Sequence, residues 1–141
     1  MPKITITLTQ EQAAVVKDAV DLMHRLRLGQ IDELRNVWPE RIPGKNNPHD
    51  SGWQRLSELR ARLDGLKQFI FPEFAMSGAS YGVGSKELTK NDNRLYEIYK
   101  VLDRALWEAD GRKNPGLSVN SDDPYLLRYS GDAKIPYKVE A

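Results

Sequence analysis

The stretch 51–70 constrains the fold most, because its apolar residues recur at alternating spacings of three and four positions. These residues are Leu56, Leu59, Leu63, Leu66 and Ile70. Such spacing places all of them on one side of an α-helix. Ser51 and Gln54 form a capping-box pattern at its start, and Pro72 ends it. We predict a long helix whose leucine seam packs against other helices of the chain or against the same helix of a second copy.

Two further stretches show the helical period behind a capping-box pattern. Thr9 and Gln12 begin the first, which stops at Gly29. Its predicted buried side consists of Val16, Ala19, Val20, Met23 and Leu26. Thr89 and Asp92 begin the second. Its predicted buried side consists of Leu95, Ile98, Leu102, Ala105 and Leu106. Together with a short helical piece over 30–38, these stretches predict a mainly helical chain with three longer helices.

A small sheet is predicted beside the helices. Residues 4–8 alternate apolar and polar side chains, which is the period of a strand with one buried face. The best partner strand is 117–120, after the last long helix. The predicted fold class is therefore α+β, mainly helical, with three longer helices packed on a two-stranded antiparallel sheet that joins the N-terminal strand to the strand after the last long helix.

The length of 141 residues fits one domain. We expect residues 1–141 to form this domain, with a core over 1–124. Residues 125–141 are rich in tyrosine and aliphatic side chains, so they are too apolar for a free tail. This C-terminal extension is expected to pack on its own chain or on a neighbour.

Composition excludes several classes of function. A formal charge of +1 gives no overall attraction to a nucleic-acid duplex. No cysteine and only two histidines argue against a metal site, and no cofactor motif is found. No apolar run is long enough to cross a membrane, so a cytoplasmic protein is expected. No catalytic base or enzyme signature is found, so no catalytic residue is assigned and we expect no enzymatic activity.

The candidate ligand site combines a glycine-rich turn with the helix that follows it. In the turn 77–85, Tyr81 and Gly82 present a ring on an otherwise bare loop. The start of the next helix favours an anionic group. Guanidinium groups at helix positions suit phosphate recognition. The predicted binding residues are Arg25, Tyr81, Gly82, Asn93, Arg94, Glu97 and Arg104. A solvated surface of salt bridges is the alternative for the charged members.

Four segments resemble a group of small phage- and prophage-encoded proteins. They are 19–25 (AVDLMHR), 29–34 (GQIDEL), 79–85 (ASYGVGS) and 94–102 (RLYEIYKVL). The resemblance covers about residues 3–123. In that group Asn-Ala-Ser precedes the tyrosine-glycine turn, whereas this chain has Gly78 in place of the asparagine. Some phage proteins of this size and architecture are sponges for nucleotide signals of bacterial immunity, such as the Thoeris anti-defence sponges. The present chain is similar to those in architecture alone.

The resemblance and the candidate site lead to one functional hypothesis. It is a non-enzymatic phage anti-defence protein that sequesters a nucleotide immune signal, either a cyclic nucleotide or a cyclic ADP-ribose-like molecule, in the host cytoplasm. A homo-oligomer, a dimer or larger, is expected because short chains build deeper pockets between subunits. The alternative is a protein-interaction module that inhibits or recruits a host or phage protein. It would act through the basic face of the helix over 51–70, formed by Arg55, Arg60, Arg62 and Lys67.

Overall fold

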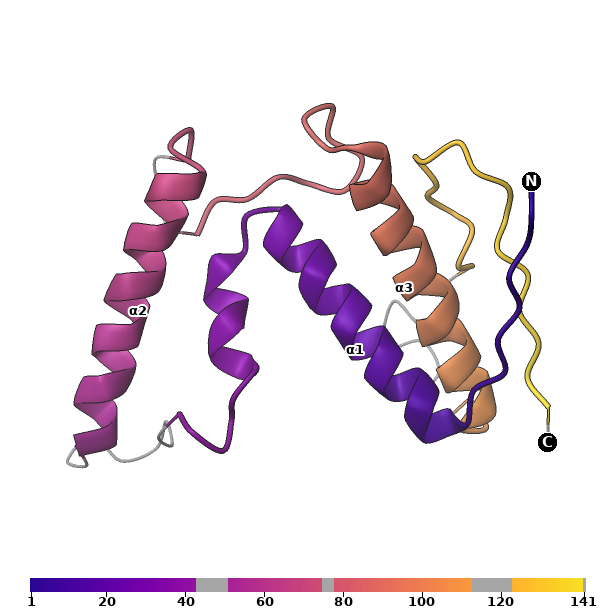
Figure 1. The fold of residues 1–141 in the computed structure, drawn as a ribbon, viewed down its shortest axis with the longest axis horizontal. Helices are drawn as coiled ribbons and strands as arrows, with labels where there is room; N and C mark the ends of the chain where they lie inside the picture. The colour runs from indigo at the N-terminus through magenta and orange to yellow at the C-terminus, as the bar shows by residue number, and fades with distance from the viewer. Residues whose placement is uncertain (43–50, 75–77, 113–122, 141) are drawn as a thin grey trace. The chain divides into compact units, whose positions relative to one another are not determined.

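The computed structural model describes residues 1–42, 51–74, 78–112 and 123–140 (Figure 1). In chain order its elements are α1 (Gln10–Arg27), the 3-10 helix η1 (Ile31–Asn36), α2 (Ser51–Ile70) and α3 (Lys90–Ala109). The three long helices lie where the sequence predicts them. The chain divides into two compact units. Unit 1 comprises Met1–His24 and Val83–Ala141, and unit 2 comprises Arg25–Gly82.

The predicted sheet is wrong: the described residues contain helices but no strand. Residues 4–8 lie outside every helix, and their apolar side chains are uncovered, with Ile4 87% and Ile6 73% exposed. The predicted partner, 117–120, falls outside the described residues. Alternation supplies a strand with an apolar face, but only a neighbouring strand supplies hydrogen-bond partners for its backbone. No described segment does so here, and the fold is mainly helical.

Local capping explains where α1 and α3 begin. The backbone N–H of Gln12 donates to the Thr9 hydroxyl at 3.1 Å, and the Thr9 N–H donates to the Gln12 side chain at 3.0 Å. Thr89 and Asp92 make the same reciprocal pair at the start of α3. Each pair satisfies backbone donors that the first turn of a helix leaves without partners. Both caps confirm the sequence patterns.

In unit 1, α1 meets α3 through polar side chains. The ring of His24 lies 5.4 Å from that of Tyr96, measured between centroids. The charges of Lys17 and Asp21 on α1 act on Asp103 of α3, and Asp103 is buried. His24 is buried as well. The contact between the two helices is therefore lined by ionisable groups.

The predicted buried face of α1 is wrong at three of its five positions. Val16, Ala19 and Met23 are exposed, whereas Val20 and Leu26 are half-buried. A helix turns by about 100° per residue, so this apolar stripe lies away from the stripe that carries Lys17 and His24. The sequence shows that α1 is amphipathic, but not which of its sides meets α3.

The C-terminal segment 123–140 is held to α3 by hydrogen bonds. The buried Glu97 carboxylate accepts from the backbone N–H of Tyr129 at 3.1 Å, from that of Ser130 at 2.8 Å and from the Ser130 hydroxyl at 2.6 Å. Further along, the Tyr137 hydroxyl donates to Glu108 at 2.9 Å. This segment thus covers α3 of its own chain.

A glycine permits one close approach in unit 1. Gly84 has a φ of +78°, and a Cβ built there would lie 2.6 Å from Cζ of Tyr129. Only a residue without a side chain accommodates both the left-handed backbone and the ring above it. Tyr129 can therefore lie over the turn that precedes α3.

In unit 2, α2 packs on η1. The buried apolar residues of these two elements are Ile31, Leu56 and Leu63. The far end of the predicted leucine seam is different, since Leu66 and Ile70 are exposed. The seam therefore serves packing within unit 2 over its first half only. No helix in the described ranges has the length and apolar character needed to cross a membrane.

Candidate functional site

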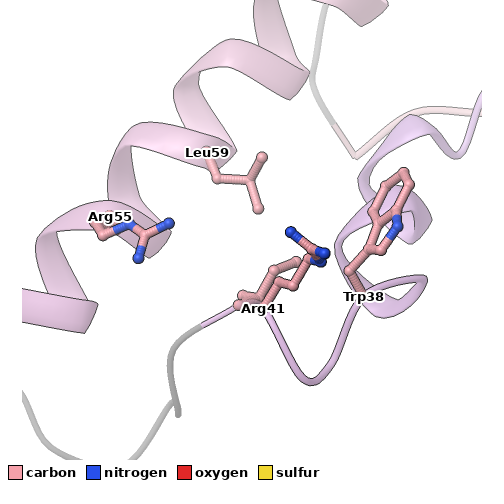
Figure 2. A pocket seen from close by; sticks show the side chains of 5 residues that line it. Trp38, Arg41, Arg55 and Leu59 are labelled. Carbon is pink, nitrogen blue, oxygen red and sulfur yellow. The ribbon is translucent and has the colours of Figure 1, made fainter.

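A pocket in unit 2 lies between the end of η1 and the first turns of α2. Its volume is about 440 Å³. The residues that line it are Trp38, Arg41, Ile42, Arg55 and Leu59. Figure 2 shows the guanidinium groups of Arg41 and Arg55 directed into the same space, with Leu59 above them and the Trp38 ring at the side. We refer to it as the Trp38–Arg55 pocket.

Short-range contacts place these side chains. The backbone N–H groups of Arg41 and Ile42 both donate to the Trp38 carbonyl at 3.0 Å, so the chain turns sharply after η1. This turn brings the Arg41 side chain back toward Trp38. Arg55 and Leu59 are four residues apart on α2 and therefore share one side of that helix. The packing of α2 on η1 then sets the two halves of the pocket opposite each other.

The charge of the pocket is not balanced by the described residues. Neither Arg41 nor Arg55 has an acidic partner in the described ranges of the chain. Other arginines are paired: Arg62 lies 2.6 Å from Glu58, and Arg104 lies 3.0 Å from Glu108. Two uncompensated guanidinium groups beside an indole ring attract an anion that also carries a flat apolar part.

A second hollow in unit 2, of about 420 Å³, is electrostatically different. It is lined by Gln30, Asp32, Glu33, Arg35, Arg60, Asp64, Lys67, Gly78 and Ser80. Acidic and basic side chains balance in this lining. Lys67 donates to the Ala79 carbonyl, and Arg25 lies 3.5 Å from Glu33 at its edge. Because its charges compensate one another, this hollow does not favour one sign of ligand, and we take the Trp38–Arg55 pocket as the candidate site.

Three of the sequence-predicted binding residues lie in unit 2. The Tyr81 ring packs against Phe74 at 4.8 Å between centroids, and its hydroxyl donates to Glu73 at 2.8 Å. Arg25 donates to the side chains of Gln30 and Glu33 at 3.4 and 3.5 Å. Gly82 is exposed, and an added Cβ would meet nothing within 4 Å. Tyr81 is thus part of an aromatic cluster and not a bare ring.

The other four predicted residues lie on α3 in unit 1. Arg94 donates to Asp132 at 2.7 Å, and this hydrogen bond raises the pKa of Arg94 and lowers that of Asp132. Arg104 pairs with Glu108 and lies over the Trp107 ring, 4.7 Å from its centroid.

The remaining two of these residues also take part in the fold of unit 1. Glu97 holds the C-terminal segment, as described above. Asn93 is half-buried, and its backbone N–H donates to the Thr89 carbonyl. The seven predicted residues are divided between two units and have structural contacts in each. Their role in ligand binding stays a prediction.

Sequence reasoning missed the Trp38–Arg55 pocket. From the sequence, Trp38 ends the short helical piece predicted over 30–38, and Arg55 belongs to the basic face of the helix over 51–70. The available signal was the spacing of Trp38 and Arg41, three residues apart across Pro39, just after a helical piece. That spacing is typical of a turn that returns one side chain to the other.

Comparisons with known proteins leave the site to be interpreted from its own geometry. No family model, curated protein or solved structure matches the chain. A search of the described ranges finds no group of three acidic, histidine or cysteine side chains that could hold a metal ion. The chemistry of the pocket therefore rests on its arginines, its tryptophan and its apolar residues.

Proposed function

We propose that this protein binds a small anionic ligand with an aromatic ring, of the nucleotide class, in the Trp38–Arg55 pocket and does not convert it. The observation that carries this proposal is the convergence of Arg41 and Arg55, without acidic partners among the described residues, on a cavity beside Trp38. Sequestration of a nucleotide immune signal, as a phage anti-defence protein in the host cytoplasm, is the role we propose for this binding.

Each part of such a ligand finds a matching group. The planar forks of Arg41 and Arg55 suit phosphate oxygens, which accept two parallel hydrogen bonds from a guanidinium. A base can stack on the half-exposed Trp38 ring. Ile42 and Leu59 supply apolar contact. A volume of about 440 Å³ lies in the range of small-molecule pockets.

The composition of the lining supports binding without turnover. General acid–base catalysis needs a side chain that gains or loses a proton near neutral pH. Among the residues that the structure describes, the lining consists of two arginines, a tryptophan, an isoleucine and a leucine. Arginine keeps its proton in proteins, and the other three have no ionisable group near neutrality. A ligand held there meets positive charge and apolar surface from the described lining, and none of these described side chains is a proton acceptor near neutral pH.

Isothermal titration against 5′-mononucleotides, cyclic mono- and dinucleotides and cyclic ADP-ribose tests the proposal. We expect at least one of these to bind and to keep its mass after incubation. Arg41→Gln and Arg55→Gln should each raise Kd by about tenfold or more, because each removes a charged partner of the phosphate. Arg62→Gln is the matched control on α2, since Arg62 pairs with Glu58 instead. No binding by any ligand in the panel, or loss of ligand mass, contradicts the proposal.

One observation favours the alternative function, a protein-interaction module built on α2. Near the C-terminal end of this helix Phe69 is 85% exposed, next to the exposed Leu66 and Ile70. Exposed apolar clusters of this kind are typical of surfaces that contact another protein. Capture of a host protein that is lost on Phe69→Ser and on joint reversal of Arg55, Arg60 and Arg62 to Glu, with nucleotide binding absent from the wild type, would favour this alternative.

A further inference from the structure

The apolar stripe of α1 has no cover in the described structure. Val15 is 69%, Met23 50% and Val16 37% exposed, and Ala19 between them is exposed as well. We call these four residues the α1 stripe. Ala19 is three or four positions from each of the other three, so all of them lie on one side of the helix along about two turns. A helix normally turns such a stripe toward its neighbour, whereas α1 turns the side that carries Lys17 and His24 toward α3.

We propose that the α1 stripe binds a second copy of this chain, with the two α1 helices antiparallel about a two-fold axis at Ala19. In this register Val15 of each copy lies opposite Met23 of the other, because both are four residues from the axis. Val15, Ala19 and Met23 therefore form a row that is complementary to itself, as a two-fold interface requires, and Val16 lies opposite the apolar Leu22. Alanine at the crossing point lets the helix axes approach closely. This inference goes beyond the proposed function and does not depend on the Trp38–Arg55 pocket.

The charges along α1 select the antiparallel direction and a second copy as the occupant. The first turn of α1 carries Glu11, and its last turn carries Arg27. Both lie eight residues from Ala19, so Glu11 of one copy lies opposite Arg27 of the other in this register. An antiparallel second copy brings the acidic end of each helix beside the basic end of the other. A parallel copy would place like charges together at both ends, which costs free energy. The stripe itself contains no charged residue, so burying it removes no charged side chain from water.

Disulfide cross-linking tests both the interface and its register, because the chain contains no cysteine. Ala19→Cys should form a covalent dimer under mild oxidation, since the two copies of residue 19 face each other across the axis, within the roughly 7 Å that a disulfide allows between Cα atoms. Val15→Cys alone is the matched control. Its two copies would lie about 12 Å apart along the helices, at about 1.5 Å per residue, and should not cross-link. Val15→Cys combined with Met23→Cys should cross-link again.

Light scattering of the full chain supplies an independent readout. We expect the wild type to have twice the mass of one chain. Met23→Glu should raise the dimer Kd by about tenfold or more without changing the helical circular dichroism, because it places a carboxylate in an apolar contact. Leu126→Glu, which changes an exposed apolar residue of the C-terminal segment, should leave the mass unchanged. A monomeric wild type overturns the proposal, and so does cross-linking of Val15→Cys as fast as that of Ala19→Cys.

Discussion

In unit 2, α2 packs on η1 and buries Leu56, Leu63 and Ile31, whereas in unit 1 the contact of α1 with α3 contains His24 and the charges around Asp103. In unit 2 apolar side chains thus meet between the two helices, although α2 also buries the charged Lys67. In unit 1, α1 leaves Val15, Val16 and Met23 exposed and buries His24. The difference shows that an amphipathic pattern identifies a helix and its two faces, while the neighbours decide which face is buried.

The largest loss of stability is expected from truncating a buried side chain in the apolar contact of unit 2. Leu56 is only 2% exposed. Leu56→Ala should lower the free energy of unfolding by about 3 to 4 kcal/mol, since it removes buried methyl groups and leaves a cavity. Chemical denaturation measures the loss, and faster hydrogen exchange of the α2 amides would locate it in unit 2.

Leu66→Ala is the matched control on the same helix. Because Leu66 is exposed, its truncation should cost less than about 1 kcal/mol. Equal losses for the two variants would show that the leucine seam of α2 is covered along its whole length, which contradicts the exposure of Leu66.

The next effect is expected from the hydrogen-bonded carboxylate of unit 1. Glu97→Gln replaces one acceptor oxygen by an amide that faces the donors of Tyr129 or Ser130. We expect a loss of about 2 to 3 kcal/mol, because hydrogen bonds to a charged group are strong and the donors are left unsatisfied. Hydrogen exchange should show faster exchange of the Ser130 amide.

An exposed carboxylate of the same unit serves as the control for Glu97. Glu140 is exposed and pairs with Lys138, so Glu140→Gln should change the stability by less than about 1 kcal/mol. A stability of Glu97→Gln indistinguishable from that of Glu140→Gln would mean that the C-terminal segment is not held through Glu97.

The prediction from sequence was accurate where the determinants are local. The reciprocal pairs at Thr9 and Thr89 involve residues three positions apart, so they can be found without knowing the fold. The strand over 4–8 was wrong because its partner must come from elsewhere in the chain. The buried side of α1 was wrong because it depends on α3, far away in sequence.

The candidate site illustrates the same limit. Tyr81 was expected to be bare because no helical pattern included it, yet Phe71 and Phe74, which follow α2, surround its ring. Trp38 and Arg55 are in one pocket because α2 packs on η1, and neither residue alone indicates this. Binding residues that are brought together by packing leave little trace in local spacing.

The smallest effect is a change in the pH dependence of unit 1. Burial raises the pKa of Asp103 above its ordinary value of 3.8, against the opposing charges of Lys17 and Lys100. The folded state therefore keeps this proton to higher pH than the unfolded state does, and stability falls as the pH rises through this range. Asp103→Asn should remove that fall, which shows as a flatter curve of unfolding free energy above about pH 4.

Asp132 in the same unit is expected to behave in the opposite way. The hydrogen bond from Arg94 lowers the pKa of Asp132 below 3.8. Its contribution is present above that value and is lost as the pH falls. Asp132→Asn should therefore flatten the acid side of the curve. If both variants flatten the same side, the carboxylates of Asp103 and Asp132 do not act on stability as described.

The order of the two units along the chain has a consequence for synthesis on the ribosome. Unit 2, Arg25–Gly82, is continuous, so every residue it needs has been made once Gly82 has emerged. Unit 1 draws on segments before and after it. Until Tyr129 and Ser130 are translated, the Glu97 carboxylate has none of the three donors that hold it and is still hydrated. We therefore expect unit 2 to fold during synthesis. The part of α1 that belongs to unit 1 can pack only after the later residues of unit 1 have been translated.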